Sequence, residues 1–147
     1  MAHELSRAKK WIVDALKADA TLLPLIGGAT NTRIYFDQAP EGATYPFIVF
    51  NLQSSSDVQG VCIPRVATRP LFQVKVVTDG PPDTNARTIA DRIDAVLGEA
   101  VAQISQSFVF SGRRERAIEY TEPKPDSAGY FTHSGGLYRL IVFPQAV

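Results

Sequence analysis

The chain has 147 residues, 45% of them hydrophobic, and its 15 basic and 15 acidic residues give a formal net charge of zero. A chain of this length buries enough surface to fold without disulfide or metal support, so we expect one domain over residues 1–147. Free nucleic-acid-binding proteins usually carry a basic excess, which this chain lacks. The single cysteine, Cys62, excludes an intrachain disulfide.

The N-terminal residues have no continuous apolar core of the length that a signal peptide needs. No run approaches the roughly 18 apolar residues of a membrane span. We therefore expect a soluble protein that is made in a cytoplasm and has no membrane partner.

The first third of the chain predicts one helix and two strands. Apolar residues spaced by three and four predict an amphipathic helix over residues 4–18, and a turn at 21–28 ends it. Trp11 flanks the apolar stripe and is expected to pack either on the core or on a neighbour. A short strand at 33–36 precedes an apolar strand at 47–52, which we expect to be central in its sheet or covered on both sides.

The middle third predicts an irregular segment, a strand and a second helix. Residues 53–57 are polar and end the strand, and we interpret the mixed residues 58–68 as the far part of a long hairpin or as a mobile arm. Alternation of apolar and polar residues predicts a strand at 71–79. A helical stripe then runs over residues 86–97, with Asp83 or Thr84 as the expected N-cap.

The last third predicts short strands at 108–110 and 116–121, a loop at 122–136 and a closing apolar strand at 137–143. The order of elements indicates an α+β fold: a mostly antiparallel β-sheet with two α-helices packed on one face and long inter-strand loops. The helix that follows the strand at 71–79 makes one parallel pair of strands possible.

The search for catalytic or metal-binding chemistry finds no complete set of residues. His3 and His133 lack a second ligand at metal-binding spacing, so we expect solvated histidines. Cys62 has no helix N-terminus beside it to lower its pKa, so we expect an unreactive, partly buried thiol. Gly135 and Gly136 are interpreted as a turn. We therefore expect no enzyme, no cofactor and no metal.

Charged residues offer two further candidates. Asp91 and Asp94 lie one helical turn apart, but Arg87 and Arg92 alternate with them, which favours a solvated, self-paired helix face over a metal site. The cluster at residues 113–116 contains three arginines. It is interpreted either as a polar turn before a strand or as a group that binds phosphate or a partner carboxylate.

Several stretches of the amino-acid sequence resemble a known family. The helix ending in ALKADATLLPLIGG and the following RIYFDQAPEGATYPFIVF are similar to the tail completion proteins of long-tailed bacteriophages, also called tail terminator or head–tail joining proteins. FQVKVVTD followed by NARTIADRIDAVL matches the strand-then-helix middle of that family. The resemblance covers residues 15–97, and the final third agrees only in its β character.

The resemblance implies a structural virion protein without active site, metal or cofactor. Such a protein forms a homo-hexameric ring at the head-proximal end of the tail and ends polymerisation of the tail tube. It contacts the tail tube protein, the head connector or stopper protein and, transiently, the DNA that passes the channel. It is made in the cytoplasm of the host bacterium and located in the virion at the tail–head junction.

We expect the contacts of such a ring to lie on the loops at 54–68 and 122–136, one of them against the neighbouring subunit and the other against the tube or connector. The candidate interface residues are Ser55, Asp57, Val58, Arg65, Arg69, Arg113, Arg114, Arg116, Lys124, Tyr130 and Phe131. Three alternatives remain: another neck protein, the equivalent part of a gene-transfer particle, and a small ligand-binding or enzymatic ferredoxin-like domain.

Overall fold

The structure, a computed structural model, describes residues 2–144. In chain order the elements are α1 (Ala2–Lys17), the 3-10 helix η1 (Leu23–Ile26), β1 (Ile34–Phe36), β2 (Phe47–Gln59), β3 (Arg65–Asp79), α2 (Thr84–Leu97), β4 (Gln103–Ser105), β5 (Phe108–Pro123) and β6 (Tyr130–Pro144). The expected order of helix, short strand, two strands and helix is present, whereas the three strands after α2 differ from those expected.

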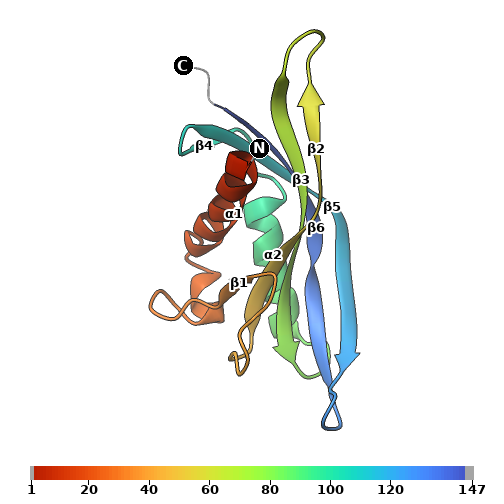
Figure 1. Cartoon of the computed structure of the whole chain (residues 1–147). Coiled ribbons are helices and arrows are strands. Elements are labelled where there is room, and N and C mark those ends of the chain that lie inside the picture. Colours follow the sequence, from red (N-terminus) through yellow and green to blue (C-terminus); the bar gives the residue numbers. More distant parts are fainter. Residues whose placement is uncertain (1, 145–147) are drawn as a thin grey trace.

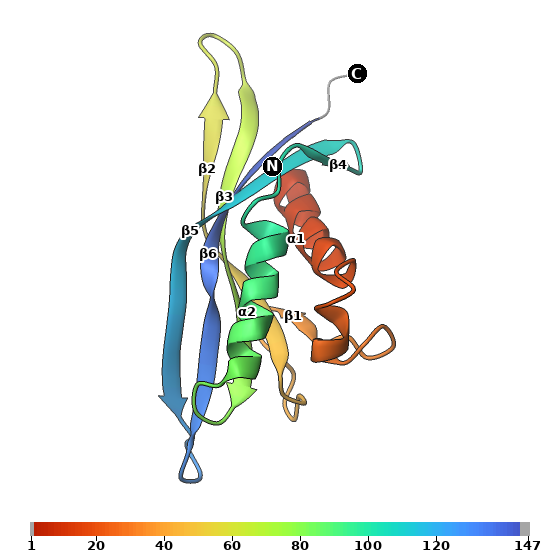
Figure 2. The same ribbon diagram turned by 180° about the vertical axis from the view of Figure 1, so that it is seen from behind.

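All six strands belong to one sheet, in the order β1-β2-β3-β6-β5-β4. Each neighbouring pair is antiparallel except β1 and β2, which are parallel. Both helices lie against the same face of this curved sheet (Figure 1), and the view from behind shows the same arrangement (Figure 2). The predicted fold class, α+β with two helices on one face, is confirmed.

The core lies between the helices and the face of the sheet that they cover, which we call the covered face. Its centre is made of apolar side chains with no solvent exposure: Ile12, Leu16, Ile48, Phe72, Val74, Val76, Ile89, Ile93, Leu97, Leu140 and Val142. The helical spacing of α1 and α2 places one apolar stripe of each helix on this layer. Trp11 is part of the core, because its ring stacks on Phe110 with centroids 5.3 Å apart.

Local sequence explains where α2 begins. The Asp83 carboxylate accepts a hydrogen bond from the Ala86 amide at 2.8 Å, which satisfies one of the free amides of the first turn. Asp83 is thus the N-cap, one of the two residues expected. Gly98 follows the last helical residue and its amide donates to the Asp94 carbonyl.

The opposite face of the sheet carries no helix, and we call it the open face. At one end its apolar residues are shielded by aromatic side chains: Phe47 is packed against Tyr35 and Tyr45, and Tyr45 stacks on Phe131 at 5.1 Å. The apolar strand predicted at residues 47–52 is therefore shielded on both sides at its start, although it lies beside the edge strand β1 and not at the centre.

The predicted location of the parallel pair of strands is wrong. The strand that precedes α2, β3, has only antiparallel neighbours, and the parallel pair is instead β1 with β2, in which Ile34 is opposite Ile48. The chain crosses from β3 through α2 to the far edge strand, β4, and then returns towards β3 through the antiparallel strands β5 and β6.

The two long loops expected at residues 54–68 and 122–136 are largely strand. β2 continues to Gln59 and β3 begins at Arg65, so only residues 60–64 turn, and Pro70 lies inside a strand opposite Ser55. In the outer part of β2 these residues are nearly all exposed, whereas the paired residues of β3 still alternate between buried and exposed, with Thr68 and Pro70 buried. The interpretation as the far part of a long hairpin is confirmed.

The loop at 122–136 was expected because of its glycines. β5 reaches Pro123 and β6 starts at Tyr130, so the turn is confined to residues 124–129. Gly135 is not in a turn: a Cβ there would lie 2.1 Å from the Val74 carbonyl oxygen. Glycine is needed at this position because neighbouring backbone approaches closely.

The strands expected at 108–110 and 116–121 are one strand, β5, and the third strand of this region is β4, which the sequence did not indicate. The cluster at residues 113–116 is therefore part of a strand, so the turn interpretation is wrong. A register shift between Arg114 and Arg116 marks a β-bulge at Glu115. A β-bulge is defined by the pairing of two strands, so the sequence of β5 alone does not reveal it.

Candidate functional site

The most prominent surface feature is a two-stranded projection formed by residues 54–69, which we call the arm. It extends past both helices as a narrow hairpin (Figure 1). Its tip carries apolar side chains in solvent: Val61 is 93% exposed and Ile63 is 55% exposed. Apolar residues at the end of a projection bury nothing in a single copy, so this tip is suited to a partner surface.

Ion pairs tie the arm to the body of the protein. The Arg65 guanidinium lies 2.6 Å from the Glu4 carboxylate in α1 and 3.9 Å from Asp57 on the opposite strand of the arm. Burial raises the pKa of Glu4, but hydrogen bonds from its backbone and from Arg65 outweigh it and leave the pKa lowered. Five of the expected interface residues lie on the arm: Ser55, Asp57, Val58, Arg65 and Arg69.

The three arginines of β5 separate onto the two faces of the sheet. Arg114 is opposite Tyr138 on the covered face, where its Nε lies 3.4 Å from the Asp94 carboxylate of α2. Arg113 and Arg116 are opposite Arg139 and Leu137 on the open face. The structure therefore removes Arg114 from the expected cluster.

Arg139 is a residue that the sequence prediction missed. It lies on β6 between Arg113 of β5 and Leu71 of β3, and its Nη1 donates to the Arg69 carbonyl at 3.1 Å. Its Nε also donates to Glu115 at 2.8 Å. The sequence does contain a signal for Arg139, because it is a charged residue inside the otherwise apolar run LYRLIVF.

The turn between β5 and β6 forms the opposite end of the molecule from the arm (Figure 1). Lys124 Nζ lies 2.5 Å from the Asp79 carboxylate, and the ammonium group also lies over the Phe131 ring. Tyr130 is 51% exposed. The expected interface residues Lys124, Tyr130 and Phe131 thus share one end of the protein, distant from those of the arm.

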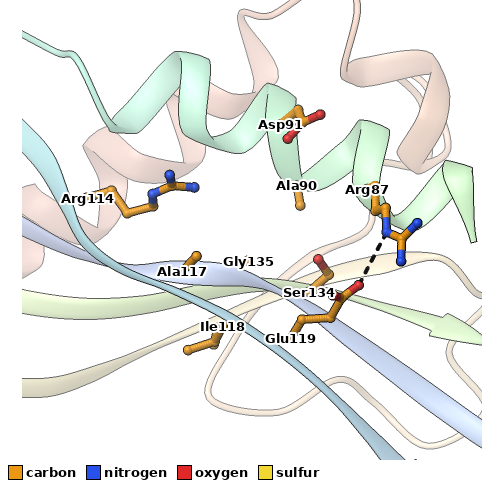
Figure 3. Close-up of a pocket in the computed structure, with 9 residues that line it drawn as sticks. All are labelled: Arg87, Ala90, Asp91, Arg114, Ala117, Ile118, Glu119, Ser134 and Gly135. Atoms are coloured by element: carbon orange, nitrogen blue, oxygen red, sulfur yellow. Dashed lines mark ion pairs between the residues drawn. The ribbon is translucent and has the colours of Figure 1, made fainter. Parts of the chain in front are cut away.

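A groove of about 400 Å³ separates α2 from the outer part of β5 (Figure 3). Arg87 of α2 points towards Glu119 of β5 across it, with 3.6 Å between Nε and Oε1. The self-pairing expected on α2 is wrong, because its charged residues pair with other elements: Arg92 pairs with Asp19 and Asp94 with Arg114. The side chains that line the groove are mostly small or charged, and Ser134 lies opposite Glu119 in the pairing of β5 with β6.

The expected solvated histidine and buried thiol are both wrong. His133 is 7% exposed, its ring stacks on Tyr120, and its Nε2 lies 2.8 Å from the Glu122 carboxylate. Burial lowers the pKa of His133, and the hydrogen bond to Glu122 only partly opposes this effect. Cys62 lies in the exposed turn of the arm. His3 lies where the structure describes no side chain.

Among the side chains that the structure describes, those of residues 4–144, no three His, Cys, Asp or Glu are grouped so as to hold a metal ion. In the same range no helix has the length and hydropathy to cross a membrane.

Comparison with known proteins gives one family. The model of the family described as "Tail completion protein gp17" matches residues 10–131. The chain belongs to this tail completion family. No protein of curated function matches it in sequence.

One solved structure with the same fold is a chain in the "Virion of native gene transfer agent (GTA) particle". It superposes with a TM-score of 0.65 over 90% of this chain and 91% of the other, at 19% sequence identity. At this identity the likeness concerns the fold. The family match makes the protein a structural component of phage-type tails, and the predicted resemblance is confirmed.

Membership of the tail completion family gives a context for the surfaces described above. The match extends from the second half of α1 to the start of β6, and so includes the arm, the bulged strand β5 and the turn that follows it. The surfaces of a virion protein that project or remain unpaired are where contacts with other tail proteins are to be sought.

Proposed function

We propose that this protein is a tail terminator. Six copies form a closed ring at the head-proximal end of the tail, stop polymerisation of the tail tube, and join the tail to the head connector or stopper. The proposed unit is the whole chain, residues 1–147, as one domain. The role involves no catalytic step, cofactor or metal. The observation that carries the proposal, beyond family membership, is the arm.

A closed ring of identical copies needs an interface between two different surfaces of the chain. The arm supplies one of them, because its tip exposes Val61 and Ile63 and its outer strand has a free edge. β1 pairs with β2 only from Ile48 to Phe50, so within residues 2–144 no strand pairs with residues 51–59 on that side. Such an edge offers N–H and C=O groups to a second chain.

The opposite end of the protein is assigned to a different partner. We place the tail tube or the head connector at the turn between β5 and β6, where Tyr130 is exposed and Lys124 is held by Asp79. A ring whose copies meet through the arm leaves this end available, since it lies at the other extreme of the sheet (Figure 2). The protein is made in the cytoplasm of a bacterial host and acts in the virion at the tail–head junction.

The test shortens each hairpin without changing the sheet. Replacing residues 58–67 by Asn-Gly joins Asp57 to Thr68, which are already opposite each other, through a two-residue turn. Native mass spectrometry should show hexamers for the wild type and monomers for this variant. The control replaces residues 124–129 by Asn-Gly between the paired Pro123 and Tyr130, and should keep the hexamer mass. An armless chain that still forms hexamers would refute the assignment of the arm.

A second test concerns the particle. Electron microscopy of particles made without this protein should show tails of uncontrolled length that lack heads. Normal tails would refute termination, and tails of correct length without heads would favour another neck protein, such as a connector or stopper. The equivalent position in a gene-transfer particle remains an alternative, supported by the shared fold with a chain of such a particle.

A further inference from the structure

A row of apolar side chains crosses β4, β5 and β6 on the open face of the sheet. Ile104 of β4 is opposite Val109 of β5, and Val109 is opposite Phe143 of β6. Directly opposed residues point to the same face, and the neighbouring Val142 is buried on the covered face, so the row lies on the open face. Ile104 is 63% exposed and Phe143 is 36% exposed. This copy therefore leaves the row largely in solvent.

Two further apolar residues continue this row. Ile141 lies two residues before Phe143 on the same face and is 40% exposed. Val101 is 79% exposed, and it lines the same hollow of about 400 Å³ as Ile141. We call Val101, Ile104, Val109, Ile141 and Phe143 the apolar patch. Single exposed apolar residues are normal on a protein surface, but a contiguous group of them is typical of an interaction site.

Arginines border the apolar patch on one side. Arg69, Arg113 and Arg139 line the hollow that holds two of its members. Arg139 donates to the Arg69 carbonyl at 3.1 Å and to the Glu115 carboxylate at 2.8 Å. Within residues 2–144, Arg113 forms no ion pair. An apolar centre with arginine beside it is the composition of a protein–protein interface, in which arginine is enriched and lysine, aspartate and glutamate are depleted.

The apolar patch and the tip of the arm lie at opposite edges of the sheet. β4 is one edge strand, and β2, which forms the outer strand of the arm, lies beside the other edge strand. Both β4 and the arm are located towards the end of the molecule that is opposite the β5–β6 turn (Figure 1). In a ring whose axis runs along the strands, an arm would therefore project at the level of the apolar patch of the next copy.

The tip of the arm has a composition that suits this patch. Residues 60–64 are Gly-Val-Cys-Ile-Pro and include no charged residue, and Val61 and Ile63 are exposed. Contact between the tip and the patch would remove apolar surface of both from water, which is the main driving force of protein association. A guanidinium group donates hydrogen bonds and accepts none, so Arg113 is suited to the backbone carbonyls of an uncharged turn.

We propose that the apolar patch receives the tip of the arm of a neighbouring copy, with Val61 and Ile63 of that copy packed on Val101, Ile104 and Ile141. The inference rests on the proposed ring and deepens it. A head-to-tail ring needs two different surfaces on each copy; the arm is one of them, and the apolar patch is the second. Each copy gives one tip and accepts one, so a closed ring leaves neither surface in solvent.

Cys62 in the tip makes this contact measurable by cross-linking. Val101→Cys and Ile104→Cys each add a second thiol, located in the patch, to the exposed Cys62. Oxidation of the assembled variants should link the tip of one copy to the patch of the next and give covalent species of up to six copies on a non-reducing gel. A disulfide needs Cα atoms within about 7 Å of each other, so it reports direct contact. Cys62→Ser/Val101→Cys should remain monomeric on the gel.

The matched control is Ser127→Cys, which adds an exposed thiol in the β5–β6 turn. This variant and the wild type should both remain monomeric on the gel. Covalent dimers of the wild type would show that two tips meet through Cys62, and would overturn the inference. Native hexamers that give no cross-link in either patch variant would overturn the inference alone. A wild type that is monomeric by native mass spectrometry would refute the ring and this contact together.

A second measurement does not depend on disulfide geometry. Val101→Ser/Ile104→Ser changes two exposed side chains, so the chain should fold as before. The protein concentration at which half of the hexamers dissociate should rise by about tenfold or more, measured by light scattering over a dilution series. Tyr130→Ser truncates an exposed side chain at the opposite end and should leave that concentration unchanged. An unchanged value in the patch variant would assign the patch to another tail protein and overturn the inference.

Discussion

The two halves of the β2–β3 hairpin have the same backbone pairing but different environments. In the inner half, Ile48, Phe50 and Phe72 are at most 2% exposed, because both helices lie on them. In the outer half, the arm, the same two strands stay antiparallel after a register shift between Leu52 and Ser54, with exposed serines and an apolar tip in solvent. The ladder of hydrogen bonds is common to both halves, so what differs is the burial of apolar surface.

This difference separates residues that maintain the fold from residues that are available to partners. Burial contributes about 25 cal/mol per Å² of apolar surface, and the arm buries little. We therefore expect substitutions in the inner half to reduce the free energy of unfolding, and substitutions in the arm to change assembly while leaving that free energy nearly constant.

The largest effect is expected from Phe72→Ala. The Phe72 ring is fully buried, with its centroid 6.2 Å from that of Phe50, so the substitution removes apolar contacts and leaves a cavity. The free energy of unfolding should fall by about 3–5 kcal/mol in urea titration. Ile63→Ala on the arm is the matched control and should change it by less than about 0.5 kcal/mol. Equal losses in the two variants would remove the distinction between the halves.

Gly135→Ala should have the next largest effect. The added Cβ would meet backbone, at 2.1 Å from the Val74 oxygen and 2.6 Å from Lys75 Cα, and so β3 or β6 must move. We expect a loss of about 1–3 kcal/mol or more in the free energy of unfolding. Gly60→Ala at the end of the arm meets only the side chain of Ile63, which can rotate away. Its stability should match that of the wild type, and a loss as large as that of Gly135→Ala would contradict the prediction.

Asp19→Asn tests a polar contact between the segment that follows α1 and helix α2. The Asp19 carboxylate accepts from Arg92 Nη2 at 2.5 Å and from the amides of Thr21 and Leu22, and its side chain is 6% exposed. Burial raises the pKa of Asp19, but these hydrogen bonds outweigh it and hold the pKa below the ordinary value of 3.8. The free energy of unfolding of the variant should be about 1–3 kcal/mol lower than that of the wild type at pH 7.

The pH dependence of this loss follows from the direction of the shift. A lowered pKa in the folded state means that the unfolded chain binds the proton more readily, so the contribution of Asp19 is present above about pH 4 and decreases as the pH falls through the folded-state pKa. Denaturation at pH 3 and pH 7 should therefore show a smaller difference between variant and wild type at pH 3. A difference that does not depend on pH would assign the effect to packing.

His133→Gln should change the free energy of unfolding less, and we expect its effect in the dependence of that free energy on pH. Because burial lowers the pKa of His133, the unfolded chain takes up the proton first as the pH drops below about 6.5, and the wild type loses stability there. The variant lacks this titration, so its free energy of unfolding should change less between pH 7.5 and 5.5. Parallel curves for the two proteins would show that His133 does not titrate between the states.

The smallest effect on stability is expected from Val61→Ser/Ile63→Ser at the tip of the arm. Both side chains are exposed, so the free energy of unfolding should stay within about 0.5 kcal/mol of the wild type. If the tip contacts a neighbouring copy, the hexamer should dissociate at a higher protein concentration than the wild type. Light scattering over a dilution series measures this, and an unchanged dissociation curve would place the copy–copy contact elsewhere.

The sequence predicted those parts of the fold that alternate between apolar and polar residues. The stripes of α1 and α2, the Asp83 cap and the burial of Phe72, Val74 and Val76 were all visible as periodic patterns. For the arm the sequence left a long hairpin and a mobile arm as alternatives, because neither face of residues 54–59 is buried and a polar strand without a buried face has no period. Gly135 was interpreted as a turn because its requirement for close backbone approach arises only when β3 lies beside β6.

The candidate site was predicted in part. The basic character of residues 113–116 was evident, but the division of Arg114 from Arg113 and Arg116 depends on a bulge, which is a property of the pairing of β5 with β6. Arg69 and Arg139 are distant from this cluster in sequence and meet it only through the order of the strands. Pairing across a sheet is non-local, and the residue types alone do not determine it.

Trp11 gives the protein an internal optical probe. It is the only tryptophan of the chain, it is 4% exposed, and its ring lies nearly parallel to that of Phe110. Its fluorescence therefore reports whether α1 is docked on β5, and it is insensitive to events at the tip of the arm. A variant with a shortened arm should keep the wild-type emission spectrum, so one cuvette measurement can separate loss of assembly from loss of folding.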